Sequence, residues 1–181
     1  MAKAIGLLTA EDLERLGPDC RCELIDGVLV EMPPVGGPHA RVTMKLGARL
    51  VSHTESGRLG RVYTELGFNL RRAPDCVRAP DLAFVRMDRI PPEGEPEGFW
   101  EIAPDLVVEV VSPNDTRGEM QLKVREWIEA GVRLVWVVFP RSRTVSVIRS
   151  LLDREDLGAD DTLDGEGVVP GFSCLVGELF E

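Results

Sequence analysis

The chain has 181 residues, of which 44% are hydrophobic, and a formal net charge of −10 at pH 7. This length and composition predict one globular domain with a sizeable core. No stretch approaches the roughly 18–20 apolar residues that a membrane helix needs, so we expect no membrane partner. The N-terminus has no secretory apolar region and no cleavage pattern, and we therefore expect a cytoplasmic protein.

The acidic excess is unevenly distributed along the chain. Residues 1–90 are nearly balanced, whereas acids dominate residues 91–181, above all between Asp153 and Glu166. A solvated acidic loop can lie far from a binding cleft, so the net charge alone leaves a nucleic-acid partner open. The spacing of Cys20 and Cys22, two of the four cysteines, is too tight for a usual zinc site. We interpret all four as reduced structural thiols.

The first elements along the chain are a short helix and a hairpin. Thr9 and Asp12 resemble a capping box, which begins the helix. Residues 22–32 alternate between apolar and polar around Asp26-Gly27, and an Asp-Gly pair between such runs is a strong hairpin signal. We therefore predict an N-terminal β-hairpin with its turn at these two residues.

A longer helix is predicted from His39 to about Thr54, where apolar residues recur at helical spacing. Beside its apolar side runs a basic stripe, which consists of Arg41, Lys45 and Arg49. Such a stripe is either a solvated helix face or an edge that contacts nucleic-acid phosphates. Both interpretations stay open, and these three cations are the candidate nucleic-acid-binding residues.

Two further strands are predicted over residues 62–70 and 77–85, with a turn between them. A surface loop follows over residues 88–104. Asp81 follows a proline and heads the apolar part of the second strand. Its carboxylate either satisfies the turn at the strand entry or serves a functional site.

The centre of the chain is an apolar run over residues 106–111 that Glu109 interrupts. A carboxylate in a buried strand is costly unless it is paired, hydrogen-bonded or bound to a metal. A helix follows with Asn114 or Asp115 as its N-cap, and its apolar stripe consists of Met120, Val124, Trp127 and Ile128. Lys123 leans toward the core from this helix, so its ammonium is expected close to the glutamate.

Strands over residues 134–139 and 144–148 follow, and the unit from the central strand to the first of them predicts a right-handed parallel crossover. The earlier hairpins indicate antiparallel pairing at the other end of the sheet. The predicted fold class is α/β, with a mixed β-sheet core flanked by helices and an N-terminal β-hairpin. We expect a single domain over residues 1–181, with its core at about 20–150 and an acidic C-terminal extension over 151–181.

Three side chains in this layout fit the chemistry of phosphodiester hydrolysis. Asp81 and Glu109, on neighbouring strands, can hold one hard divalent cation through oxygen ligands. Such a cation activates water and neutralises charge on the phosphate, and Lys123 can orient that water or stabilise the developing negative charge. A structural ion pair between the glutamate and the lysine is the main alternative.

Several motifs in this order resemble the Uma2 (DUF820) family of endonucleases, which belong to the PD-(D/E)XK restriction endonuclease-like superfamily. The motifs that carry the resemblance are Glu23-Leu-Ile-Asp26-Gly27, Pro38-His39, Arg78-Ala-Pro80-Asp81-Leu-Ala-Phe84-Val85, Glu109-Val-Val-Ser112-Pro113 with Lys123, and Val169-Pro170-Gly171-Phe172. Each motif is weak singly, but the set in this order is specific. The family often has tyrosine where this chain has Trp127.

The resemblance implies a restriction endonuclease-like fold and roles for five residues. Asp81 and Glu109 would be ligands of Mg²⁺, with Mn²⁺ as a substitute, and Lys123 would be the catalytic lysine displaced onto the helix. Glu23 would support the metal and its waters, and His39 would act near the scissile phosphate. Without the resemblance, the glutamate is expected to be an exposed cross-strand partner and the histidine a helix cap or surface residue.

The leading hypothesis is a magnesium-dependent endonuclease that hydrolyses phosphodiester bonds in DNA, with RNA left open. We expect a homodimer, because two sites naturally serve the two strands of a duplex. One alternative is a catalytically inactive module that keeps the nuclease fold and binds nucleic acid or protein. A more distant alternative is a metal-dependent hydrolase of a small phosphoester.

Overall fold

The computed structural model describes residues 6–17 and 19–181. Residues 1–5, on which the expectation of no secretory signal partly depends, lie outside the described part of the chain. Within the described residues, no helix combines the length and the apolarity needed to cross a bilayer.

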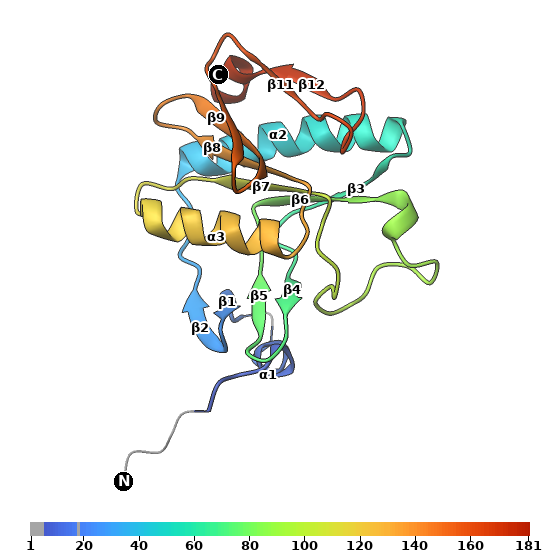
Figure 1. Ribbon diagram of the computed structural model, residues 1–181, viewed down its shortest axis with the longest axis vertical. Coiled ribbons are helices and arrows are strands. Elements are labelled where there is room, and N and C mark those ends of the chain that lie inside the picture. The colour runs from blue at the N-terminus through green and yellow to red at the C-terminus, as the bar shows by residue number, and fades with distance from the viewer. Residues whose placement is uncertain (1–5, 18) are drawn as a thin grey trace.

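The larger of the two main sheets has six strands in the order β10-β9-β8-β7-β6-β3 (Figure 1). These strands are β3 (Gly60–Tyr63), β6 (Leu82–Arg86), β7 (Leu106–Val110), β8 (Leu134–Phe139), β9 (Thr144–Ser150) and β10 (Asp153–Leu157). β7 and β8 pair in parallel, and the other neighbouring strands of the described sheet are antiparallel. The helix α3 (Arg117–Glu129) connects the parallel pair. The predicted mixed sheet and its strand–helix–strand unit are therefore confirmed.

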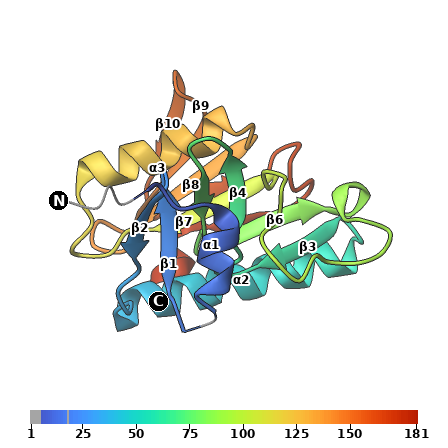
Figure 2. The ribbon, with the colours of Figure 1, turned by 90° about the horizontal axis from the view of Figure 1, so that it is seen from below.

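Two helices cover opposite faces of this sheet, as the view from the small-sheet end shows (Figure 2). α2 (Gly37–Ser56) lies on one face, and its buried residues pack in one core cluster with alternate residues of β7 such as Val108. α3 lies on the other face, where Trp127 packs in a second cluster with Val107. Because side chains alternate along a strand, Glu109 shares the α3 face with Val107.

The smaller sheet has four strands in the order β2-β1-β5-β4. These strands are β1 (Cys22–Ile25), β2 (Val28–Glu31), β4 (Phe68–Arg71) and β5 (Cys76–Arg78). β1 and β2 form the predicted hairpin, and both turn residues, Asp26 and Gly27, have positive φ angles of 51° and 75°. This geometry suits the Asp-Gly pair, because glycine adopts it without a steric penalty and aspartate tolerates it.

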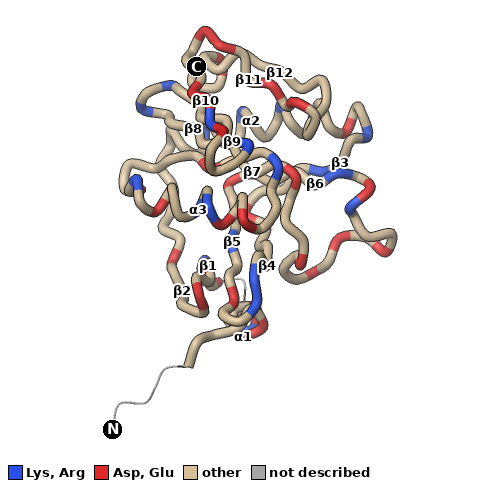
Figure 3. The backbone as a smooth tube through the Cα atoms, in the orientation of Figure 1, with Lys and Arg blue, Asp and Glu red and all other residues tan. Residues whose placement is uncertain are grey.

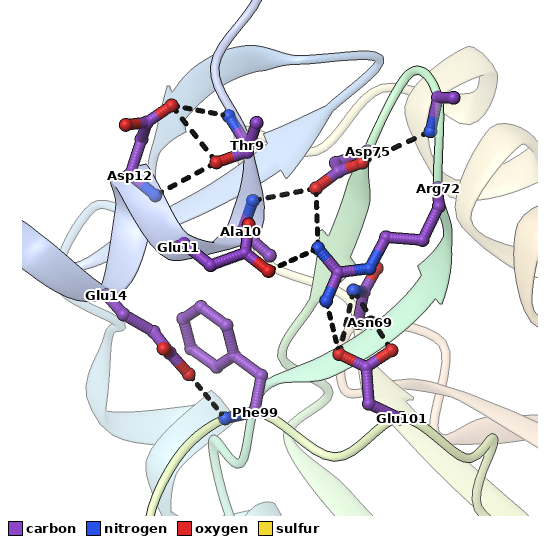
Figure 4. A network of polar contacts seen from close by, with 11 residues as sticks. Thr9, Ala10, Glu11, Asp12, Glu14, Asn69, Arg72, Asp75, Phe99 and Glu101 are labelled. Carbon is purple, nitrogen blue, oxygen red and sulfur yellow. Dashed lines mark hydrogen bonds and ion pairs between the residues drawn. The ribbon is translucent and has the colours of Figure 1, made fainter.

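A polar network holds the short helix α1 (Ala10–Arg15) against the β4–β5 hairpin (Figure 4). The Arg72 guanidinium donates hydrogen bonds to Glu11, Asp75 and Glu101. Asp75 in turn accepts a hydrogen bond of 2.8 Å from the backbone N–H of Ala10, the first residue of the helix. The capping box predicted at the start of this helix is confirmed.

The prediction of two long strands over residues 62–70 and 77–85 was wrong in one respect, because each predicted strand is broken in the middle. The first becomes β3 and β4 and the second becomes β5 and β6, so one bent hairpin contributes strands to both sheets. At the bend Glu65 has a φ of 52°, and its N–H donates to the carbonyl oxygen of Pro80. The proline has no N–H to continue a ladder, which favours a break at this point.

We expected the acidic segment 151–181 to be an extension of a core at about 20–150. Part of this segment instead belongs to the core. Its elements are β10, β11 (Thr162–Asp164), β12 (Ser173–Leu175) and the 3₁₀ helix η2 (Val176–Phe180). Leu163, Phe172 and Leu179 are buried in the same cluster as the α2 face of the sheet. The acids themselves gather on the surface around these strands (Figure 3). β10 is an exposed edge strand, and charged side chains on an edge discourage pairing with another chain.

Candidate active site

Glu109 is the centre of the candidate site and is 2% exposed in the middle of β7. Its Oε1 accepts a hydrogen bond of 2.8 Å from the indole Nε1–H of Trp127, and its Oε2 lies 3.2 Å from Lys123 Nζ. Both partners come from α3, one turn apart, so they share a helix face. The meeting of a strand glutamate and a helix lysine agrees with the expectation from the two periodicities. The sequence analysis had assigned Trp127 to the core alone.

The position of α3 depends on its N-terminus, where the predicted cap was wrong. Thr116 is the N-cap, and it forms a reciprocal capping box with Glu119. Asp115 instead accepts a hydrogen bond from the N–H of Ser112 and shapes the turn before the helix. Two orphan backbone donors are satisfied in the capping box, which fixes where the helix starts and therefore which residues face β7.

Glu23 reaches the same pocket from β1 of the smaller sheet and is 3% exposed, so it is not an exposed cross-strand partner. One carboxylate oxygen accepts from Arg78 NH1 at 2.6 Å. The other accepts from the backbone N–H of Ala79 at 3.1 Å and lies 3.9 Å from Lys123 Nζ. The two sheets and α3 therefore each contribute a charged group to one cluster.

Arg78 is a site residue that the sequence analysis did not single out. It lies at the end of β5, is 2% exposed, and joins Glu23 to Glu126 of α3 through hydrogen bonds of 2.6 and 2.7 Å. A buried guanidinium is costly unless acids pair with it on several sides. The available signal was an arginine three residues before Asp81 in an otherwise apolar strand, but no local pattern indicates its two distant partners.

A second chain of hydrogen bonds begins at Asp81, immediately before β6. Its Oδ2 accepts from the N–H of Val110 at 2.6 Å, and its Oδ1 lies 2.9 Å from His39 Nε2. The other ring nitrogen of His39 lies 3.0 Å from Ser112 Oγ. His39 is 7% exposed in the first turn of α2, so it is neither a cap nor a surface residue. Asp81 is thus fixed between the central strand and this helix.

The cluster strongly perturbs its ionisable groups. Burial raises the pKa of Glu109 to about 7, and the nearby Lys123 only partly offsets that effect. Burial alone would lower the pKa of Lys123, but the charges of Glu109 and Glu23 outweigh it and raise that pKa. The same balance applies to His39. Burial lowers its pKa, but the hydrogen bond to Asp81 and the charges of Asp81, Asp115 and Glu109 together raise it. Perturbed groups gathered in this way are typical of functional sites.

The donor set suits a hard divalent cation. The acids Glu23, Asp81, Glu109 and Glu126 are accompanied by the cations Arg78 and Lys123, which leaves a local excess of negative charge. Among the described residues, no group of three or more His, Cys, Asp or Glu side chains is arranged to hold a metal. Magnesium nevertheless uses only one or two carboxylates, and it takes its other ligands from water and substrate phosphate. Asp81 and Glu109 supply two carboxylates, and each of their oxygens is hydrogen-bonded or lies beside a cation within the chain.

The basic stripe of α2 has partners within the chain. Arg41 and Lys45 both donate to the backbone carbonyl oxygen of Glu181, and Arg49 donates to the Glu178 carboxylate at 2.6 Å. These contacts attach η2 to the helix. Phosphate binding by the stripe stays a prediction, and the intramolecular contacts argue against it because they already engage all three cations.

Comparison with known proteins agrees with the fold. No curated protein matches the chain. A crystal structure from Anabaena variabilis, described as "a putative nuclease belonging to DUF820", is 22% identical and has a TM-score of 0.84. The match covers 96% of this chain and 97% of that chain, which shows a shared fold. Residues 10–177 match the family model Uma2, described as "Putative restriction endonuclease". The chain therefore belongs to the Uma2 family, and its fold is that of a nuclease.

Proposed function

We propose that the protein is a metal-dependent endonuclease that hydrolyses phosphodiester bonds in DNA, with Mg²⁺ as the cofactor and Mn²⁺ as a substitute. The observation that carries the proposal is the close approach of Lys123 to Glu109 of β7, beside Asp81. The lysine lies 3.2 Å from the Glu109 carboxylate, and Asp81 is hydrogen-bonded to the N–H of Val110, the next residue of β7, and its charge helps to raise the pKa of Glu109. Membership of the Uma2 family supports the reaction class. A structural ion pair between Glu109 and Lys123 alone would not explain why Glu23, a buried acid from the smaller sheet, also lies 3.9 Å from the same ammonium.

The residues have distinct roles in this proposal. Asp81 and Glu109 would hold the ion, which supplies Lewis acidity toward water and phosphate. The Lys123 ammonium, held by Glu109 and Glu23, would donate hydrogen bonds to the attacking water or to the phosphate oxygens as negative charge develops. His39 keeps Asp81 oriented through its 2.9 Å hydrogen bond. The oxygen of a water molecule forms the new bond to phosphorus as the bond to one ester oxygen breaks, and the proton that the water loses ends on that leaving oxygen, which becomes a hydroxyl group.

The test compares the wild-type protein with Glu109→Gln and Asp81→Asn, which keep the side-chain shape but remove the charge. Glu129→Gln is the matched control, since Glu129 is an exposed acid on α3 away from the cluster. Supercoiled plasmid and single-stranded circular DNA are incubated with Mg²⁺, with Mn²⁺ or with EDTA. We expect metal-dependent cleavage by the wild-type protein and the control, and a rate at least about 100-fold lower in both site variants. Equal cleavage by all four proteins would refute the assignment.

A catalytically inactive binding module is the second candidate, and one observation favours it. Each oxygen of Asp81 and Glu109 already accepts a hydrogen bond or lies beside a cation within the chain. Calorimetry with Mn²⁺ separates the two candidates. Metal uptake that Glu109→Gln abolishes supports the nuclease, whereas DNA binding without metal uptake supports the module. The predicted homodimer is tested by sedimentation velocity on the same samples.

A further inference from the structure

A largely apolar groove opens from the candidate active site along α2. Its volume is about 410 Å³, which is within the range of pockets for small molecules. We call it the α2 groove, and its apolar walls consist of Val35, Met44, Val51, Val62, Tyr63 and Leu82. His39 and Asp81 also line it. In Figure 2, α2 runs beneath β3 and β6, the strands that contribute Val62, Tyr63 and Leu82 to the groove. The groove and the proposed metal site therefore share Asp81, and the groove also contains its hydrogen-bond partner His39.

The walls of the α2 groove include large apolar side chains that the chain itself does not cover. Met44 is 72% exposed, Val35 is 42% exposed and Val51 is 36% exposed. Several such side chains beside an active site indicate a binding surface. Among the described residues that line the groove there is no lysine or arginine, and its charged residues are Glu65 and Asp81. This chemistry suits a neutral, flat, apolar group and opposes a phosphate.

The substrate strand provides such a group at this position. Asp81 is one of the residues that line the α2 groove, so a nucleotide whose phosphate lies at Asp81 has this apolar space next to its base. In a duplex the base faces are stacked and the edges are paired, so a base cannot enter an apolar groove without being unpaired. An unpaired base can enter such a groove. Apolar and aromatic contacts with bases depend little on which base is bound. The intramolecular pairing of Arg41, Lys45 and Arg49 also leaves few cations near the groove for a duplex backbone.

We propose that the α2 groove binds one unpaired nucleobase adjacent to the scissile phosphate. The substrate is then single-stranded DNA, or an unpaired segment within a duplex. This inference deepens the proposed nuclease function and rests on it for the identity of the strand. Met44 is an adaptable side chain suited to contact any base, which predicts weak base specificity.

The experiment measures binding separately from cleavage. A short fluorescent oligothymidylate is titrated against the Glu109→Gln protein, and fluorescence anisotropy gives the Kd. Met44→Glu is introduced into the Glu109→Gln protein to place a charge in the groove. Leu152→Glu, in the same background, is the control because Leu152 is 99% exposed and lies in the β9–β10 turn, away from the groove. We expect Met44→Glu to weaken binding about fivefold or more, which corresponds to the loss of one base contact. Leu152→Glu should leave the Kd unchanged, and thermal melting checks that both proteins fold.

The outcomes distinguish this inference from the proposed function. An equal Kd in the Met44→Glu and Leu152→Glu proteins would refute the groove assignment, even if the wild-type protein cleaves DNA. Tighter binding of a fully paired hairpin, unaffected by Met44→Glu, would refute it as well. Loss of a dimer in Met44→Glu with an unchanged Kd would show that a second copy covers the groove, which also overturns the inference. Binding that depends on Met44, without any cleavage by the wild-type protein, would support the groove and refute the nuclease.

Discussion

The hydrogen bond from Trp127 to Glu109 leads to a quantitative prediction about stability. Trp127→Phe keeps an aromatic ring against Phe68 but removes the indole N–H that donates to the buried carboxylate. Trp136→Phe is the matched control. Trp136 is equally buried and packs against Phe172, yet among the described residues its Nε1 has no hydrogen-bond partner.

The magnitude follows from that single difference. Both substitutions leave a cavity of similar size, so the cost of the cavity nearly cancels when the two changes in the free energy of unfolding are compared. Trp127→Phe loses a hydrogen bond to a charged group, worth about 1.5–3 kcal/mol. Trp136→Phe removes a donor that is buried without a partner and recovers part of a desolvation cost of about 1–3 kcal/mol. We therefore expect Trp127→Phe to be the more destabilising by about 3 kcal/mol.

The assay is urea denaturation of both variants in EDTA, with unfolding monitored by far-UV circular dichroism. The gap between the two free energies of unfolding should be largest at pH 8. Burial raises the pKa of Glu109 to about 7, so the carboxylate is charged above that pH, and the contribution of the charged hydrogen bond declines as the pH falls below it. Equal destabilisation by the two substitutions, or a gap independent of pH, would refute the assigned role of Trp127.

Three further predictions concern stability. Arg78→Met removes the guanidinium between the buried Glu23 and the partly buried Glu126 and should lower the free energy of unfolding by about 3–5 kcal/mol, and an unchanged melting temperature would contradict the ion-pair assignment. Gly60→Ala places a Cβ against the carbonyl oxygen of Val85 and should cost about 1–3 kcal/mol in the same measurement. Burial raises the pKa of the Cys76 thiol to about 11 from the usual 9.0, so the folded state keeps its proton longer and stability should fall as the pH rises from 9 to 11. Cys76→Ala should remove about 2–3 kcal/mol of that fall, and an identical pH profile would exclude the thiol as its cause.

The local periodicities predicted much of the central unit. The predictions of a strand over residues 106–111 and of a helix after it were confirmed. Both elements bury apolar residues in a regular pattern, and that pattern can be recognised from the spacing of apolar residues in the sequence. The placement of Lys123 beside Glu109 followed from those two periods. The Asp26-Gly27 turn was predictable for a different reason, since few residues other than these adopt its backbone geometry.

The errors arose where the fold depends on partners that are distant in the sequence. Residues 62–70 and 77–85 were predicted as unbroken strands although Pro80 interrupts the second, and no local pattern shows that each half pairs in a different sheet. The burial of Arg78 and Glu23 is a consequence of that bend. The acidic strand β10 was expected to be a loop because its charges suit solvent, and an edge strand also meets that requirement.

The bent hairpin also joins two sheets that can separate from each other before the whole protein unfolds. The smaller sheet carries Glu23 and Arg78, whereas Glu109 belongs to the larger sheet, so the charged cluster stays assembled only while both layers are docked. Opening of the four-stranded layer alone would disperse the charged cluster while the six-stranded core stayed folded. Inactivation at low urea should therefore precede the main melting transition, and amide exchange in β1 and β5 should report that earlier event.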